Sequence, residues 1–89
     1  MKNICIIGAG TAGLISALML KQSLNVNITI IKSDKIGIIG VGEGSENKFT
    51  QFLKFCNIDK EEIIKETGAT LKYGILFKNW TDKDFIHEV

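Results

Sequence analysis

A run of glycines near the start of the chain has the spacing of a phosphate-binding turn. Gly8-Ala9-Gly10-Thr11-Ala12-Gly13 reads as G-x-G-x-x-G. In such a turn the first glycine permits a tight bend, the second lets a pyrophosphate approach the backbone, and the third lets a helix pack closely on a strand. The start of that helix adds backbone N–H donors and a partial positive charge. The pattern predicts a bound dinucleotide, and the alternative is a set of glycines that serve packing alone.

The ribose of a dinucleotide needs a hydrogen-bond acceptor at the end of the second strand. An acidic residue about twenty positions further on normally supplies it. Lys32 stands at that place instead, followed by Ser33 and Asp34, and a lysine carries no acceptor. Three alternatives stay open. Asp34 or Ser33 accepts the hydroxyls, Lys32 meets a phosphate as in an NADP-type site, or Lys32 is a solvated surface residue.

The glycine turn needs a strand before it and a helix after it, and the sequence predicts both. Asn3 to Ile7 is a nearly continuous apolar run, typical of a strand buried on both faces of a parallel sheet. A helix is expected from about Thr11 to Ser23, and a β-branched strand from Ile28 to Ile31. The buried stripe of that helix is expected to consist of Leu14, Ala17, Leu18 and Leu24. Strand, helix and strand within about 30 residues form a βαβ unit, so the fold class is α/β with a Rossmann-like dinucleotide-binding unit.

A second glycine-rich segment runs from Ile36 to Ser45. Glycine at this density favours neither helix nor strand, so we expect an ordered loop whose backbone approaches another group closely. A helix is predicted next from about Glu46 to Cys56, with an apolar face made of Phe49, Phe52, Leu53 and Cys56. A short helix follows from Lys60 to Glu66, with Asp59 as its N-terminal cap and Gly68 at its C-terminal end.

The segment from Thr70 to Asn79 alternates apolar and polar residues, which predicts a strand with one mainly apolar face. Lys72 then lies on the face opposite Tyr73, and Gly74 is expected to leave open space beside it. From alternation alone, a solvent-facing surface lysine is the favoured interpretation. The chain beyond this strand is polar, so we expect no further element there and assign no role to His87.

The composition is that of an ordinary soluble protein, with room for one small domain. The 89 residues are 45% hydrophobic and 24% charged and carry a net charge of +1, which indicates neither a nucleic-acid nor a membrane partner. The eleven basic residues are all lysines, so bidentate arginine clamps on a phosphate are excluded. Cys5 and Cys56 match no metal motif and are expected to be buried thiols in a reducing compartment. The apolar N-terminus has no signal-peptide cleavage site, and we expect a cytoplasmic protein without a metal ion.

Three segments of the chain carry a family resemblance. In order and spacing, Gly8–Leu14, Gly40–Ser45 and Gly68–Trp80 resemble the N-terminus of flavin-dependent halogenases of the tryptophan halogenase type. The first segment is shared with many flavoproteins. The Gly-Val-Gly-Glu of the second, joined to the Gly-Ala-Thr-x-Lys of the third, is far more particular. The resemblance spans residues 2 to about 80.

This resemblance implies a cofactor, a chemistry and a role for one lysine. In such enzymes reduced FAD, supplied by a separate flavin reductase, acts with oxygen to turn a halide ion into hypohalous acid. The acid travels to a separate pocket, where a lysine directs it onto an electron-rich aromatic substrate. Lys72 falls on the position of that lysine, which reverses the interpretation from alternation. An ammonium can donate a hydrogen bond to the oxidant, and a desolvated amine can act as a nucleophile.

The resemblance also implies that Gly40-Val41-Gly42-Glu43 belongs to a strap that touches the flavin. Glu43 suits equally well a place at the positive end of the following helix. The predicted cofactor-binding residues are Gly8, Ala9, Gly10, Thr11, Ala12, Gly13, Ser33, Asp34, Gly40, Val41, Gly42 and Glu43.

Enzymes that the chain resembles are several times longer. We therefore expect residues 1–89 to be the N-terminal portion of an FAD-binding domain, inactive alone. A fragment or truncated reading frame of a longer halogenase is favoured over one chain of a split enzyme. There are two alternative classes: another flavin or nicotinamide oxidoreductase, and a non-catalytic nucleotide-binding fragment. The aromatic substrate, whether tryptophan, another indole, a pyrrole or a phenol, is left open.

Overall fold

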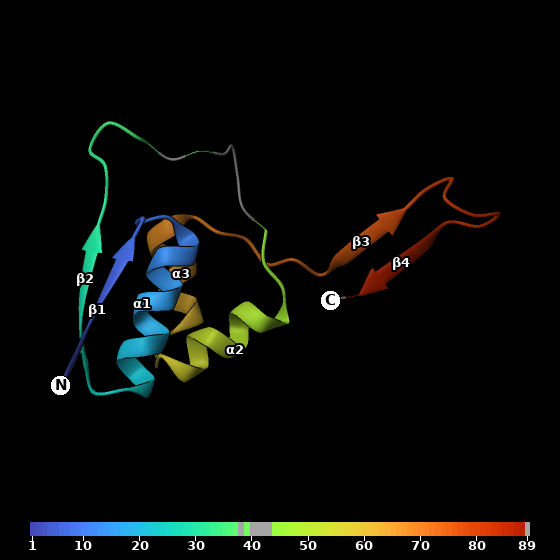
Figure 1. Ribbon diagram of the computed structural model, residues 1–89. Helices are drawn as coiled ribbons and strands as arrows, with labels where there is room; N and C mark the ends of the chain where they lie inside the picture. The colour runs from blue at the N-terminus through green and yellow to red at the C-terminus, as the bar shows by residue number, and fades with distance from the viewer. Residues whose placement is uncertain (38, 40–43, 89) are drawn as a thin grey trace.

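The structure is a computed structural model that describes residues 1–37, 39 and 44–88. Along the chain it contains β1 (Lys2–Ile7), α1 (Thr11–Ser23), β2 (Val26–Ile31), α2 (Asn47–Phe55), α3 (Lys60–Thr67), β3 (Gly74–Phe77) and β4 (Phe85–Glu88). Figure 1 shows the β1–β2 sheet with all three helices on one side of it. The β3–β4 hairpin extends away from this body and makes the molecule long, with extents of 57 × 31 × 26 Å.

The predicted βαβ unit is present. β1 and β2 pair in parallel, with Ile4 opposite Ile28 and Ile7 opposite Ile31, and α1 is the crossover between them. β2 begins two residues earlier than predicted because Val26, only 3% exposed, already pairs with Lys2 and is buried. The α/β class and the Rossmann-like start of the fold are confirmed.

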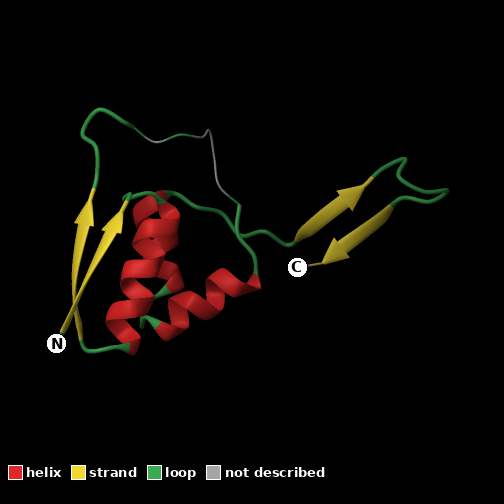
Figure 2. Ribbon diagram, in the orientation of Figure 1, coloured by secondary structure: helices red, strands yellow, loops and turns green. Residues whose placement is uncertain are grey.

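Helix α1 covers only one face of the β1–β2 pair (Figure 2). Side chains alternate along a strand, so Ile4 and Ile6 are half-buried whereas Cys5 and Ile7 are exposed, Ile7 by 85%. No described residue covers the second face. The prediction of a strand buried on both faces is therefore wrong for the part of the chain described. The expected burial of Cys5 is wrong too, while Cys56 is half-buried; both thiols are free.

The buried stripe of α1 differs from the prediction. Ala17 is buried at 9% exposure, but Leu14 and Leu18 are each 46% exposed and Leu24 is 52% exposed. Gly13 and Ala17 lie four residues apart and therefore on one helix face. These two small residues let the helix axis approach the sheet closely, which leaves the larger leucines at the flanks.

Helix α2 has the apolar face that the sequence predicts. Leu53 is buried at 4% exposure, and Phe49, Phe52 and Cys56 are half-buried. The rings of Phe49 and Phe52 contact each other with centroids 5.8 Å apart. The helix begins and ends one residue inside the predicted range.

Helix α3 has both predicted caps. The Asp59 carboxylate accepts a hydrogen bond from the backbone N–H of Glu61 at 3.2 Å. Gly68 ends the helix in the left-handed region, with φ 69°, and its N–H donates to the carbonyl oxygen of Ile64 at 3.0 Å. A glycine is favoured there because other residues adopt this conformation at a cost.

The C-terminal hairpin corrects two predictions. The predicted strand from Thr70 to Asn79 is confined to β3, because a strand needs a partner and β3 begins at Gly74, opposite Glu88. The polar stretch after it contains β4, which was not predicted, and His87 pairs there with Ile75.

Aromatic side chains hold the hairpin together. The rings of Phe77 and Phe85, opposite each other in register, stack with centroids 4.9 Å apart. Trp80 packs edge-on against Phe77 at 6.0 Å. In the connecting turn, the Asn79 N–H donates to the Asp84 carboxylate at 3.0 Å. These contacts stabilise locally a strand that was not predicted, because only Phe85 and Ile86 interrupt the otherwise polar segment after Trp80.

Candidate functional site

The glycine turn joins the carboxyl ends of both parallel strands. Gly8 follows β1 with φ +114°, a backbone conformation that residues other than glycine rarely adopt. Its N–H donates a hydrogen bond of 2.8 Å to the carbonyl oxygen of Ile31, the last residue of β2. This bond fixes the first bend of the turn against the end of the neighbouring strand, as a tight βα turn requires.

The other two glycines of the turn serve different ends. A Cβ at Gly13 would overlap the carbonyl oxygen of Gly8 and lie 3.0 Å from its carbonyl carbon. Gly13 is therefore required for the close packing of α1 on β1. A Cβ at Gly10 would meet no atom within 4 Å. The packing of the described residues therefore does not require a glycine at position 10. The backbone of Gly10 faces space that a ligand can enter.

The start of α1 suits an anion. Gly10 is the N-cap and provides no side-chain hydrogen bond, and no acidic residue lies in the first turn. The first intrahelical bond runs from the N–H of Leu14 to the carbonyl oxygen of Gly10 at 3.0 Å. A helix start without an acidic cap presents N–H donors and partial positive charge to a negatively charged ligand. This geometry is compatible with the pyrophosphate of a dinucleotide.

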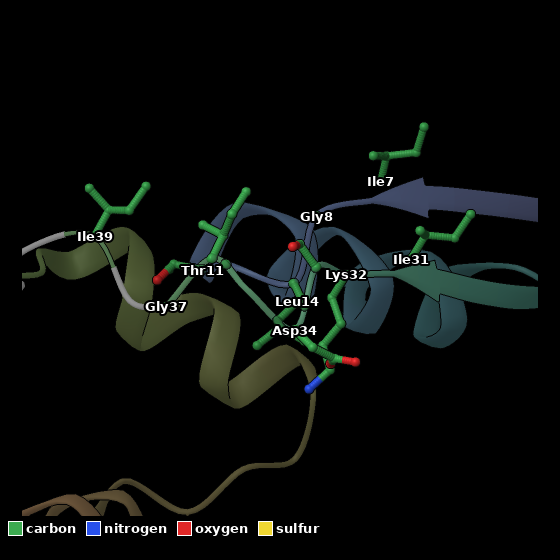
Figure 3. Close-up of a pocket in the computed structure, with 13 residues that line it drawn as sticks. Ile7, Gly8, Thr11, Leu14, Ile31, Lys32, Asp34, Gly37 and Ile39 are labelled. Carbon is green, nitrogen blue, oxygen red and sulfur yellow. The ribbon is translucent and has the colours of Figure 1, made fainter.

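An open groove of about 1200 Å³ lies over the turn. Figure 3 shows that its walls come from the two strand ends, the glycine turn, the start of α1 and the segment after β2. It is lined by Ile7, Gly8, Ala9, Gly10, Thr11, Leu14, Ile31, Lys32, Ser33, Asp34, Ile36, Gly37 and Ile39. Six of the predicted cofactor-binding residues therefore meet in one groove. Ala12 and Gly13 are not among the lining residues, since Gly13 faces β1 instead.

Sequence reasoning missed the apolar part of the lining. Ile7 and Ile31 end their strands side by side and are 85% and 52% exposed. Ligands of open α/β sheets bind beyond the carboxyl ends of the strands, so the last residue of each predicted strand was the available signal. Ile36 and Ile39 also line the groove and have no such signal.

The residues after β2 form a turn at the rim of the groove. The Ser33 hydroxyl accepts a hydrogen bond from the Lys35 N–H at 3.2 Å. The side chains of Lys32 and Asp34 are exposed and line the groove. Of the described residues, none donates a hydrogen bond to Asp34 or pairs with its charge.

Two predicted functional parts are not among the described residues that line the groove. Of these, Gly40, Val41, Gly42 and Glu43 fall outside the residues that the structure describes.

Lys72 is exposed in the segment between α3 and β3, before the first paired residue of the hairpin, and it does not line the groove. It makes no hydrogen bond or ion pair within the described part of the chain. The prediction of open space beside Lys72 at Gly74 is wrong, because a Cβ at Gly74 would lie 2.9 Å from the carbonyl oxygen of His87 in β4.

None of the helices described is long and apolar enough to cross a membrane.

Comparison with known proteins gives consistent matches over nearly the whole chain. The family model described as tryptophan halogenase matches residues 3–88. The 7-chloro-L-tryptophan 6-halogenase KtzR of Kutzneria sp. is 39% identical over 77 residues, which are 84% of this chain and 15% of that protein. The crystal structure of the tryptophan 6-halogenase SttH from Streptomyces toxytricini superimposes with a TM-score of 0.87 and 32% identity, over 99% of this chain and 19% of that one.

A second solved structure gives the same result. Tar14, a tryptophan C-6 flavin-dependent halogenase from taromycin biosynthesis, superimposes with a TM-score of 0.84 and 33% identity. It is covered over 18% of its length, so this chain spans less than a fifth of the relatives it matches. On the family match over residues 3–88 and on these likenesses, the chain belongs to the tryptophan halogenase family.

Proposed function

We propose that residues 1–89 are the N-terminal portion of the FAD-binding domain of a flavin-dependent halogenase. The whole enzyme would halogenate an electron-rich aromatic substrate; the relatives' names give tryptophan and 7-chloro-L-tryptophan. The observation that carries the proposal is the groove over the glycine turn, in a chain that the family model matches from residue 3 to residue 88. A cytoplasmic location and a separate flavin reductase belong to the same proposal.

The residues of the turn have the properties that the pyrophosphate of FAD requires. Gly10 leaves its backbone approachable, and the start of α1 offers N–H donors where no acidic side chain repels the anion. The apolar ends of β1 and β2, Ile7 and Ile31, give the groove a wall that excludes water from a flat ligand. Gly40 to Glu43 would contact the flavin.

When bound and reduced, FAD with oxygen supplies the oxidising power that converts a halide ion to hypohalous acid. Lys72 acts on that product and not on the nucleotide. Its place outside the groove supports this division, since the lysine belongs to a separate segment of the chain. Its ammonium would donate a hydrogen bond to the oxidant and aim the halogen at the aromatic ring.

A halogenation assay separates this function from that of another oxidoreductase. An intact enzyme that carries these residues at its N-terminus is expected to convert tryptophan or a related indole to a halogenated product. The reaction needs reduced FAD, oxygen and chloride or bromide, and mass spectrometry detects the halogen by its isotope pattern. Oxidation of reduced flavin without halogen incorporation into any indole, pyrrole or phenol would favour an oxidoreductase that shares only the nucleotide fold.

The 89-residue chain alone is expected to bind FAD weakly. The groove presents one edge of a nucleotide site, and the described residues leave the second face of its sheet uncovered. A ligand that contacts its site on one side loses most of the burial that gives affinity. Fluorescence titration of the purified chain with FAD should therefore show no saturation at micromolar concentrations. A micromolar complex would show that the part described here is a complete flavin site.

A further inference from the structure

We propose that Asp34 recognises the ribose hydroxyls of the adenosine half of the cofactor. An acidic residue normally has this role at the position that Lys32 occupies in this chain. The inference rests on the proposed nucleotide site and adds the residue that selects a free 2′-hydroxyl over a 2′-phosphate. The observation behind it is the turn after β2, where Lys32, Ser33 and Asp34 all line the groove but differ in their capacity to accept hydrogen bonds.

The position of this turn follows from the strand register. Ile31 ends β2, and its carbonyl oxygen accepts the 2.8 Å hydrogen bond from the Gly8 N–H. Lys32, Ser33 and Asp34 therefore begin directly beside the phosphate-binding bend and run along the rim of the groove (Figure 3). A ribose linked to a pyrophosphate at α1 would lie within reach of this rim.

The chemistry of the three side chains distinguishes them. A ribose diol presents two hydroxyl donors, and an ammonium such as that of Lys32 has no acceptor to offer. The Ser33 hydroxyl already accepts from the Lys35 N–H at 3.2 Å and so helps to shape the turn. An ionised carboxylate is acceptor-only and can take both hydroxyls. Asp34 lines the groove, and no described residue uses its oxygens, so it is the acceptor available.

The same carboxylate sets the preference between nucleotides. A 2′-phosphate placed against Asp34 would bring two negative charges together, which is unfavourable. Lys32 is exposed and lies two residues away, so its solvated ammonium offsets this repulsion only in part. The turn is therefore expected to favour FAD-type and NAD-type riboses over the NADP type.

The 89-residue chain is small enough for residue-by-residue NMR titration, which reports weak binding directly. We choose ADP, 2′-deoxy-ADP and adenosine 2′,5′-bisphosphate as probes, and the amide signals of Gly8, Gly10 and Gly13 as reporters. ADP is expected to shift these signals at millimolar concentration and to bind about fivefold to tenfold more tightly than 2′-deoxy-ADP. In Asp34→Ala this ratio should fall to about one, because the remaining interactions are common to both nucleotides.

Matched variants separate the roles of charge and position. Asp82→Ala removes an exposed aspartate from the β3–β4 turn and should leave the ADP to 2′-deoxy-ADP ratio unchanged. Lys32→Ala should leave that ratio unchanged as well, and Lys35→Ala controls for the loss of one positive charge outside the lining.

The outcomes distinguish this inference from the proposed function. ADP shifts with an unchanged ratio in Asp34→Ala would overturn the role of Asp34 and leave the nucleotide site standing. Tighter binding of adenosine 2′,5′-bisphosphate than of ADP, lost in Lys32→Ala, would overturn it in favour of an NADP-type site. An absence of shifts at the three glycines with millimolar ADP would overturn both the inference and the proposed nucleotide site.

Discussion

Gly13→Ala is expected to destabilise the chain by about 2 kcal/mol, although alanine is the better helix former. Alanine in place of glycine inside a helix normally gains about 0.5–1 kcal/mol. Here the added methyl group would overlap the carbonyl oxygen of Gly8 and approach its carbonyl carbon to 3.0 Å. Both atoms are backbone, and the Gly8 N–H is tied to β2, so the contact is relieved only if α1 moves away from β1.

Thermal unfolding followed by circular dichroism measures this effect. For a chain of this size the melting temperature should fall by about 10 °C. The matched control is Gly10→Ala, in the same turn, where the added methyl meets nothing within 4 Å and φ is −78°. We expect its stability to change by less than about 0.5 kcal/mol.

Gly10→Ala, which should change stability little, is expected to weaken nucleotide binding. Gly10→Ala puts a methyl group into the space that the pyrophosphate is proposed to approach, so a folded, stable variant should bind ADP about tenfold more weakly. If Gly13→Ala were as stable as the parent chain, the close contact between α1 and β1 would be wrong. If Gly10→Ala bound ADP normally, the turn would not approach the phosphates.

The first third of the fold was predictable because its signals are local. Strand ends, helix and glycine turn lie within 31 residues, and each has its own pattern of β-branched residues, helix periodicity or glycine spacing. The caps of α3 were predictable for the same reason, since Asp59 and Gly68 act on backbone atoms two and four residues away. Such contacts do not depend on the rest of the chain.

The failures concern partners that a local pattern does not name. Leu14 and Leu18 have the right spacing for a buried stripe, yet the sheet contacts the neighbouring face of α1, where Gly13 and Ala17 permit closer approach. β3 is shorter than its alternation predicts, because strand length depends on β4. β4 was missed because its four residues, Phe85–Glu88, are too short a run to stand out after the polar turn, whereas their pairing with β3 brings Phe85 to stack on Phe77.

The candidate site shows the same division. The glycines that line the groove were predicted from spacing, and Ser33 and Asp34 from their distance along the chain. The groove's isoleucine walls were not predicted, because Ile7 and Ile31 become neighbours only through the parallel register. The packing role of Gly13 was also predicted, from its place in the motif, and the overlap of a Cβ there with the carbonyl oxygen of Gly8 agrees with it.

Lys72→Ala is expected to remove halogenation almost completely from an intact halogenase that carries these residues at its N-terminus. The loss in turnover should be about a thousandfold or more, within the range for side chains that act directly on a reacting group. FAD binding should be unchanged, because Lys72 is not among the residues that line the groove. Product formation measured by mass spectrometry and flavin content measured by absorbance test the two parts separately.

Two further variants test what the lysine does. Lys78→Ala removes another exposed lysine six residues further along, just after β3, and should keep full activity. Lys72→Arg keeps the positive charge and the hydrogen-bond donors but removes the amine that can become a nucleophile, because a guanidinium stays protonated. Partial activity in Lys72→Arg would indicate that a hydrogen bond aims the oxidant, and none would indicate a reacting amine. Normal halogenation by Lys72→Ala would contradict both roles and return Lys72 to the surface lysine that alternation alone predicts.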